Sequence, residues 1–237
     1  MPIQQTAYRA DTAGTKPYDV VQIIRYSIKV LRGQRPNDAP SGVNLTAKEA
    51  LWVLAHLVGD IHQPLHVGAA YFDSQCVNMV DPNVVGRGAP NFGIGSTVVD
   101  TMGGNDFTIS SSKSLHMYWD DSAVVGAMRL VGVRNKSIAD FANALMRQPR
   151  TGWQTAGDLD GWSTQWASEI MPTAKDAIME VEIGNATHAS SDRAAKCTWP
   201  VTLDRDYSGF ANQHAQVQLA KAGYRLAALL VAIFEGH

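Results

Sequence analysis

The sequence predicts an all-α, mainly helical single domain, and three features support this: the chain length, the apolar periodicity and one long polar stretch. With 237 residues and 45% hydrophobic residues, the chain can bury a continuous core. Residues 67–105 are rich in Gly and Asn, and we expect a long loop there, which is usually functional or mobile. Apolar residues recur at helical spacing in six stretches, at about 19–32, 46–61, 114–131, 137–147, 159–182 and 206–234.

The N-terminal region divides into an arm and the first helix. Residues 1–18 hold no periodic apolar pattern, so we expect an irregular arm there and one helical domain over residues 19–237. Asp19 can cap the first helix, because its carboxylate can accept a free amide hydrogen of the first turn. Gly33 can end that helix, since glycine tolerates the left-handed conformation that follows a helix.

The second predicted helix carries a pair of residues that can bind a metal ion. Thr46 and Glu49 form a capping box that sets where this helix begins. His56 and Asp60 are four positions apart, so both side chains lie on one face of the helix. Pro64 disfavours helix in the residue before it, so the helix should end near residues 61–63.

Three more residues extend this pair into a candidate metal site. His66 follows the predicted break and can turn back toward the same pocket, while His116 and Asp120 repeat the four-residue spacing on a later helix. One such pair is most often a solvated or satisfied helix pair, but two pairs weaken that interpretation. Five His and Asp ligands exceed what one tetrahedral zinc ion accepts, so we expect more than one metal. His62 comes two positions after Asp60 and is interpreted as a structural or supporting histidine.

Two local features of the later chain carry further expectations. Residues 98–109 can form a short hairpin, and the run Gly103-Gly104-Asn105 is either an ordinary turn or a place where the backbone approaches a ligand closely. Pro172 should bend or break the helix predicted over 159–182. The six tryptophans are interpreted mostly as core residues, because large aromatic side chains at helical spacing pack inside.

Composition excludes several classes of protein. The net charge is −2, so there is no general basic field to hold nucleic acid. No apolar run reaches the roughly 18 residues of a membrane helix, and the first residues lack a signal-peptide pattern. Cys76 and Cys197 are too few for a disulfide scaffold. They form either one bridge, if the protein is secreted, or two separate buried thiols.

Several motifs together resemble the single-strand-specific zinc nucleases of the S1/P1 family. They are HLVGDIHQPLHVG at 56–68, Gly-Gly-Asn at 103–105, Leu-His at 115–116 and Trp-Asp at 119–120. Residues 218–227 are similar to that family's last helix. The resemblance implies the helical fold of the phospholipase C/P1 nuclease type. It also implies a zinc-dependent endonuclease and 3'-nucleotidase that hydrolyses phosphodiester bonds of single-stranded DNA or RNA.

The resemblance also implies roles for the five candidate ligands. His56 and Asp60 match ligands of a first zinc, and Asp60 also matches a bridge to a third. His66, His116 and Asp120 match the protein ligands of a second zinc. The family's remaining N-terminal ligands and its catalytic acidic residue have no match here, so we expect a domain that lacks its first quarter. One complete zinc site is therefore expected, where the family holds up to three, and the catalytic residue is left unassigned.

Gly103, Gly104 and Asn105 match residues that contact the nucleotide base in the family. The expected partner is a single-stranded nucleic acid or a nucleotide, and we expect a monomer without a membrane span, secreted or periplasmic like the family. Two alternatives stay open. One is a zinc phospholipase C-like phosphodiesterase, and the other is an inactive metal-binding remnant.

Overall fold

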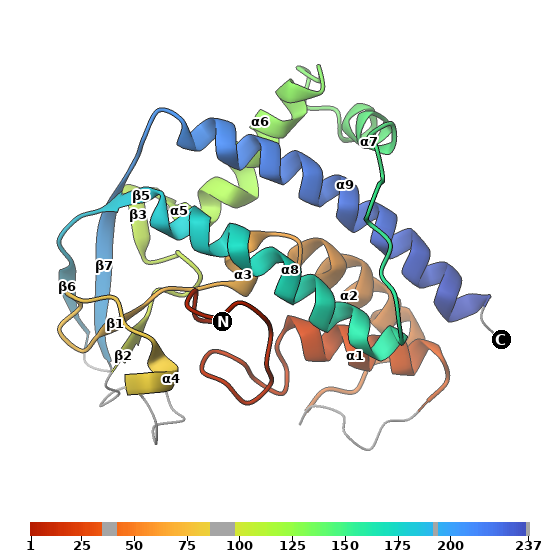
Figure 1. Cartoon of the computed structure of the whole chain (residues 1–237), viewed down its shortest axis with the longest axis horizontal. Coiled ribbons are helices and arrows are strands. Elements are labelled where there is room, and N and C mark those ends of the chain that lie inside the picture. Colours follow the sequence, from red (N-terminus) through yellow and green to blue (C-terminus); the bar gives the residue numbers. More distant parts are fainter. Residues whose placement is uncertain (35–41, 86–97, 192–193, 236–237) are drawn as a thin grey trace.

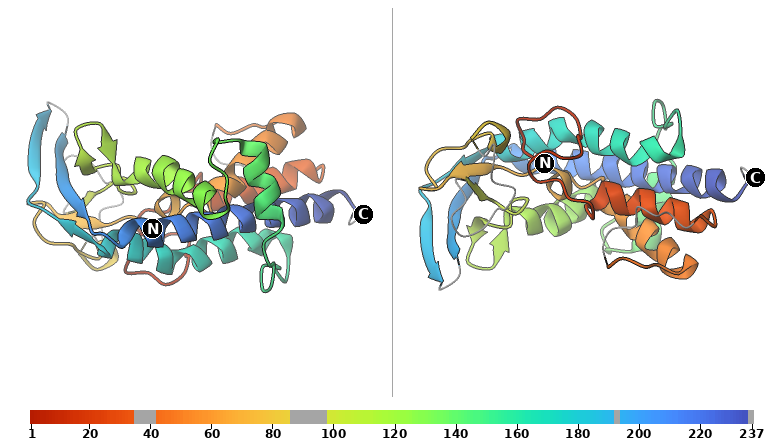
Figure 2. Two further views of the ribbon diagram at one scale, coloured as in Figure 1. Left: turned by 90° about the horizontal axis from the view of Figure 1, so that it is seen from above. Right: turned by 90° about the horizontal axis from the view of Figure 1, so that it is seen from below.

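The computed structural model describes residues 1–34, 42–85, 98–191 and 194–235, and helices dominate it as predicted (Figure 1). Helix α1 packs against α2 and α8, and the long helix α9 contacts α2, α6, α7 and α8. The helices extend toward the C-terminus, whereas strands β6 and β7 stand at the opposite end of the molecule (Figure 2). The described helices that build this body are α1 (Val20–Leu31), α2 (Ala47–Asp60), α3 (Pro64–Val67), α6 (Ala123–Leu130), α7 (Ile138–Met146), α8 (Leu159–Met179) and α9 (Tyr207–Phe234).

The predicted starts and stops of the first helices are confirmed. Asp19 accepts a hydrogen bond from the amide of Gln22 at the start of α1. Thr46 and Glu49 satisfy each other's amides at the start of α2, which ends at Asp60. Pro64 then begins α3, where its missing N–H costs no helical hydrogen bond. The residue that follows the predicted break, His66, therefore lies on a short helix rather than in an irregular turn.

The helix predicted over 114–131 is built from three consecutive helical pieces. These are α5 (Leu115–Met117), a π-helical turn η1 (Tyr118–Ser122) and α6. Helix α8, in contrast, runs without interruption through Pro172, so of the predicted bend or break the break is wrong. Pro172 lies on an exposed side of α8, where the carbonyl that loses its helical partner can bind water instead.

Small sheets add to the helical body, and the sequence did not predict most of them. Strand β7 pairs in parallel with β3 and in antiparallel fashion with β5 and β6, while β1 pairs with β2. The predicted hairpin over 98–109 is wrong, because β2 and β3 belong to different sheets. The long stretch 67–105 holds β1, a short helix α4 (Pro82–Val85) and β2, and its residues 86–97 lie outside the described part. The strands are β1 (Tyr71–Asp73), β2 (Val98–Asp100), β3 (Phe107–Ser110), β4 (Lys113–Ser114), β5 (Val181–Ile183), β6 (Thr187–Ser191) and β7 (Ala194–Leu203).

The N-terminal arm is largely irregular, as predicted, but it is packed against the domain. The side chains of Met1 and Ile3 are buried. The amide of Ile3 donates to the carbonyl of Ala69, and the amide of Ala69 donates to the carbonyl of Met1. These two hydrogen bonds hold the arm beside the segment that leaves α3.

A disulfide joins Cys76 to Cys197, with 6.4 Å between their α-carbons. This decides between the two alternatives left open by the sequence, in favour of the bridge. The bridge ties the segment after β1 to β7, where the indole of Trp199 donates to the carbonyl of Cys76. The ring of Phe72 stacks on that of Trp199, with ring centroids 4.4 Å apart. The disulfide therefore lies within the hydrophobic core between the sheets and the helices.

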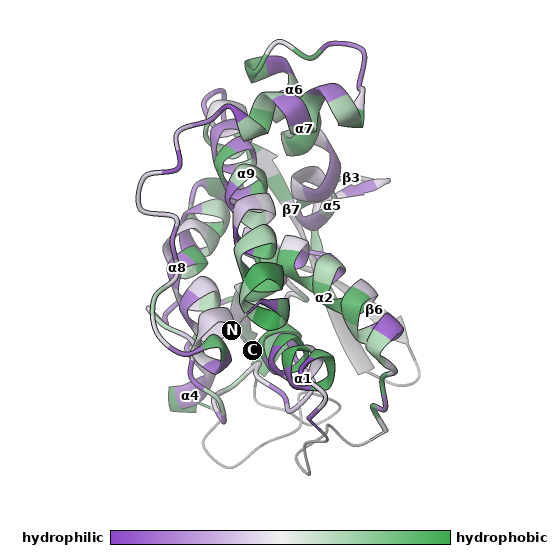
Figure 3. Cartoon of the chain, turned by 90° about the vertical axis from the view of Figure 1, so that its right-hand side faces the viewer, coloured by the Kyte–Doolittle hydropathy of each residue, from purple (hydrophilic) through white to green (hydrophobic). Residues whose placement is uncertain are grey.

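Helix α9 is, among the described helices, the one that is long and apolar enough to cross a membrane by length and composition alone. A core helix of a soluble protein passes the same test. Hydrophobic residues gather on α1, α2 and α9, which lie together at the centre of the view in Figure 3. Because α9 packs against four other helices, its apolar composition is accounted for by the core of this fold.

Candidate metal site

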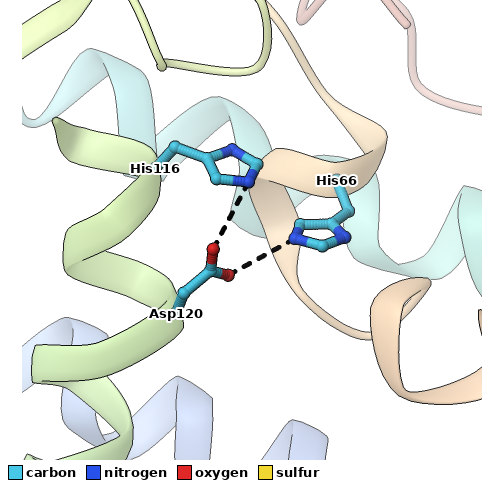
Figure 4. A group of neighbouring side chains, drawn as sticks. All are labelled: His66, His116 and Asp120. Atoms are coloured by element: carbon cyan, nitrogen blue, oxygen red, sulfur yellow. Dashed lines mark hydrogen bonds and ion pairs between the residues drawn. The ribbon is translucent and has the colours of Figure 1, made fainter. Parts of the chain in front are cut away.

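Three of the predicted ligands converge at one point, where the chain brings α3, α5 and η1 together (Figure 4). One donor atom from each of His66, His116 and Asp120 lies within 4.8 Å of the other two. Asp120 approaches His66 Nε2 with Oδ1 at 3.3 Å and His116 Nε2 with Oδ2 at 3.5 Å. The two imidazole rings stack, with centroids 4.8 Å apart and planes inclined by 14°. Two imidazoles and a carboxylate in this arrangement form a ligand set that suits zinc.

Gln63 holds this cluster together, and the sequence analysis did not identify it. Its side-chain oxygen accepts a hydrogen bond from the amide of Leu65 and so caps α3. Its side-chain nitrogen donates to Asp120 Oδ1 at 3.0 Å. A single residue therefore joins the helix that carries His66 to the carboxylate of the site. Its position before a proline indicates a cap, but nothing local indicates the contact with Asp120.

The glycine turn before β3 orients the imidazole of His116. The carbonyl oxygen of Gly103 lies 2.9 Å from His116 Nδ1, so the other ring nitrogen faces the cluster. Gly103 and Gly104 both have positive φ, of 59° and 80°. A Cβ on Gly103 would lie 2.3 Å from the carbonyl oxygen of Leu65, so only glycine fits this contact. Asn105 is exposed, and its side-chain amide donates to the carbonyl of Met102.

His56 and Asp60 extend the cluster along α2. Asp60 Oδ2 lies 3.2 Å from His56 Nε2 and 3.5 Å from His66 Nδ1. The ring of His66 is therefore placed between two carboxylates, while the side chain of His56 is exposed at the edge of the site. Asp60 is the residue that contacts both His56 and His66 and so connects the two groups of predicted ligands.

The two carboxylates change the protonation of His66. Burial would lower its pKa, but hydrogen bonds with Asp120 and Asp60 outweigh burial and raise the pKa to about 9. The pKa of Asp120 moves the other way. Burial would raise it, but the contacts with His66 and Gln63 hold it below its ordinary value. The two carboxylates therefore favour the positively charged form of the His66 imidazole.

His62 is a structural histidine, as predicted. It is buried, and burial is the main cause that lowers its pKa to about 3. Its Nδ1 lies 2.7 Å from the carbonyl oxygen of Val58, and its Nε2 lies 3.1 Å from a guanidinium nitrogen of Arg225. Arg225 also pairs with Glu169 of α8. Both ring nitrogens therefore have partners within the protein. Through them, His62 connects α2 to Arg225 of α9, which pairs with Glu169 of α8.

A cleft of about 360 Å³ opens beside the cluster. The cluster side of the cleft includes His66, Asp120 and Gln63, and α2 contributes His56 and Asp60. The other lining residues are largely apolar and come from η1, α6 and α9, chiefly Trp119, Val124, Ala215 and Leu219. A charged rim next to an apolar wall is the form expected for a site that holds a molecule with both anionic and flat apolar parts.

Together, the fold and the side-chain geometry define a helical protein with a cluster of two histidines and one carboxylate, a candidate metal site, beside a cleft. The sequence profile of the S1/P1 nucleases matches residues 2–235, so the chain belongs to the S1/P1 nuclease family.

Relatives from Arabidopsis thaliana are similar along most of this chain. Endonuclease 4 is 27% identical over 215 residues, which cover 90% of this chain and 58% of the relative. Endonuclease 2 is 27% identical over 216 residues, which cover 90% of this chain and 60% of the relative. The chain therefore spans less than two thirds of the length of these relatives.

Proposed function

We propose that this chain is a zinc-dependent nuclease that hydrolyses phosphodiester bonds of single-stranded DNA or RNA and the 3'-phosphates of nucleotides. The observation that carries the proposal is the convergence of His66, His116 and Asp120 at the edge of the cleft. Membership of the S1/P1 nuclease family supports it, and so do relatives named as endonucleases.

The donor atoms fit zinc better than a hard cation. Three protein ligands that include two imidazoles are typical of catalytic zinc, which keeps a further position open. His66, His116 and Asp120 would hold one ion, and His56 with Asp60 would contribute to a neighbouring one. A bound zinc ion supplies Lewis acidity to a phosphoryl oxygen and activates water near neutral pH.

The surrounding residues prepare the site for a substrate. Gln63 and Gly103 hold Asp120 and His116 in place before any ligand arrives, which lowers the entropy lost on binding. The apolar wall of the cleft suits the flat face of an unstacked base, and this supports a preference for single strands. Following the family resemblance, Gly103, Gly104 and Asn105 are proposed to contact that base. The disulfide is consistent with secretion or a periplasmic location.

Zinc content tests the metal assignment directly. We expect about one tightly bound zinc per chain by elemental analysis after dialysis, and His116→Ala should remove it, because the variant loses one of three ligands. His214→Ala is the matched control, since His214 is half-buried on α9 and packs on Phe210 rather than in the cluster. Equal zinc content in the wild-type protein and His116→Ala would contradict the assignment.

Cleavage assays test the reaction on the same protein. The zinc-loaded chain should cleave single-stranded DNA faster than the same sequence in a duplex, and His116→Ala should abolish most of that cleavage. A soluble phospholipid serves as the alternative phosphodiester substrate. Cleavage of the phospholipid without cleavage of DNA would instead support a phospholipase. A zinc-loaded chain that cleaves neither would support an inactive metal-binding remnant.

A further inference from the structure

Trp52 is exposed to solvent, although most of the other tryptophans are packed inside. Its exposed fraction is 65%, whereas Trp119, Trp166 and Trp199 are at most 2% exposed. Its neighbours on α2 continue the apolar surface, since Leu51 is 37% exposed and Ala55 is also exposed. A large aromatic ring inside an exposed apolar patch marks a surface that is used for binding.

Trp52 lies on the same face of α2 as the metal site. Lys48, Trp52, His56 and Asp60 follow one another at intervals of four residues, so they form a row along the helix. The ammonium group of Lys48 lies 4.8 Å from the centre of the Trp52 ring. At the other end of the row, His56 contacts Asp60. The row therefore places a lysine, an aromatic ring and the two candidate metal ligands of α2 one after another along the helix.

The same row is continuous with the cleft. Ala55, His56, Gly59 and Asp60 all line the cleft, and Trp52 lies one helical turn before His56. Four residues of an α-helix rise about 6 Å. Asp60, which contacts His66 of the cluster, comes eight residues after Trp52, so a ligand whose phosphate is held at the cluster must extend along about 12 Å of α2 to reach the ring.

We propose that Trp52 is a stacking platform for a base of the single-stranded nucleic acid, and that Lys48 contacts the phosphate beside that base. This inference rests on the proposed nuclease function and deepens it. Each base has a flat π-face that can stack on an exposed indole, and this contact tolerates any base sequence. In a duplex the bases stack on each other instead, so the platform favours single strands. The ammonium group of Lys48 lies over the Trp52 ring, and this positive charge favours an anionic ligand with aromatic bases over an apolar protein surface.

Three variants separate ring stacking from apolar contact and from general surface effects. Trp52→Leu removes the aromatic ring and keeps an apolar side chain, and Trp52→Phe keeps a smaller ring. Tyr18→Leu is the matched control. Tyr18 is 57% exposed beneath the ammonium group of Lys16, at 5.6 Å, but it does not line the cleft. Because both side chains are exposed, we expect the unfolding midpoints of the three variants in urea to stay close to that of the wild-type protein.

Binding is measured by fluorescence anisotropy with a fluorescein-labelled, phosphorothioate-linked decathymidylate, which resists hydrolysis, and zinc-loaded protein. Loss of one stacked base should weaken binding between about 5-fold and 150-fold in Trp52→Leu. Trp52→Phe should recover most of the affinity, and Tyr18→Leu should bind like the wild-type protein. Binding should quench part of the tryptophan fluorescence of the wild-type protein, and that part should disappear in Trp52→Phe.

The outcomes distinguish this inference from the nuclease proposal. If the wild-type protein cleaves ordinary single-stranded DNA but Trp52→Leu binds the decathymidylate with unchanged affinity, the stacking platform is refuted and the nuclease proposal stands. If the wild-type protein binds zinc but does not cleave DNA, the nuclease proposal itself fails. If Trp52→Leu instead converts a dimer into a monomer in light scattering, without loss of oligonucleotide affinity, the face joins two copies of the chain and the inference is wrong.

Discussion

Removal of the Cys76–Cys197 disulfide is expected to destabilise the folded chain strongly. The bridge joins residues that are 121 positions apart. In the chain-entropy description, closing a loop of this length removes about 16 cal/mol/K from the unfolded chain, or about 5 kcal/mol at 25 °C. Measured losses for native disulfides are about 2–5 kcal/mol. We therefore expect the free energy of unfolding to fall by about 3–5 kcal/mol when the bridge is opened.

The same perturbation reaches the metal site through the sheet. Cys197 lies on β7, which pairs with β3 through Phe107 and Trp199. Strand β3 follows the turn whose Gly103 carbonyl orients the imidazole of His116. Loosening β7 should therefore also lower the affinity for zinc, because this part of the site depends on the position of that turn.

Urea unfolding followed by tryptophan fluorescence measures the effect, with the oxidised protein compared with the Cys76→Ala/Cys197→Ala variant. Both cysteines are buried, so alanine adds a small cavity cost to the loss of the bridge. The wild-type protein reduced with dithiothreitol is the control without that cavity. Equal unfolding midpoints for oxidised and reduced wild-type protein would refute the reasoning. Two titratable thiols in the folded, unreduced protein would rule out the bridge itself.

Two further predictions concern the turn beside the metal site and the ion pair behind it. Gly103→Ala should lower both stability and zinc affinity, since its Cβ would meet a backbone oxygen of α3. Gly132→Ala is the control, because Gly132 also has a positive φ but its Cβ would have no neighbour within 4 Å. Equal losses of urea stability in the two variants would show that the close contact has no effect. Burial would raise the pKa of Glu169, but its contacts with Arg225 and a neighbouring lysine hold the pKa below the ordinary 4.5. Its stabilising contribution is therefore present above pH 4.5 and is lost as the pH falls through the lowered pKa. In urea unfolding measured at several pH values, Glu169→Gln should flatten this loss of stability in acid, whereas Glu182→Gln, at an exposed position, should not. If both variants lost stability in acid as the wild-type protein does, Glu169 would not be the residue responsible.

The helix ends near the site could be predicted because they depend on interactions between residues close in sequence. Asp19 caps α1 through a residue three positions later, and Thr46 and Glu49 are also three positions apart. Pro64 acts on its immediate neighbours. Such contacts are visible in the sequence because the backbone geometry of a helix turn is the same in every protein. A bend or break was predicted at Pro172, and no break occurs, because the cost of a proline also depends on whether water can reach the freed carbonyl.

The strands were missed for the opposite reason. Phe107 of β3 pairs with Trp199 of β7, and no local pattern connects two strands so far apart in the chain. The same holds for Gln63, whose contact with Asp120 spans 57 positions. The segment 98–109 does contain strand-forming residues. Its pairing was wrong because partners on other segments took the place of a local hairpin.

The sequence alone identified the candidate metal ligands, since side-chain chemistry and four-residue spacing are properties of the sequence itself, and the family resemblance divided them into two groups. Only the tertiary structure decided where their donor atoms lie relative to one another. His66, His116 and Asp120 meet within 4.8 Å, whereas His56 stays at the exposed rim and touches the cluster through Asp60. Those positions depend on the hydrogen bonds of Gln63 with Asp120 and of Gly103 with His116, which join residues far apart or in different elements of the chain. A ligand set follows from residue types, but a metal site requires donor atoms held at fixed distances, and those distances arise from packing.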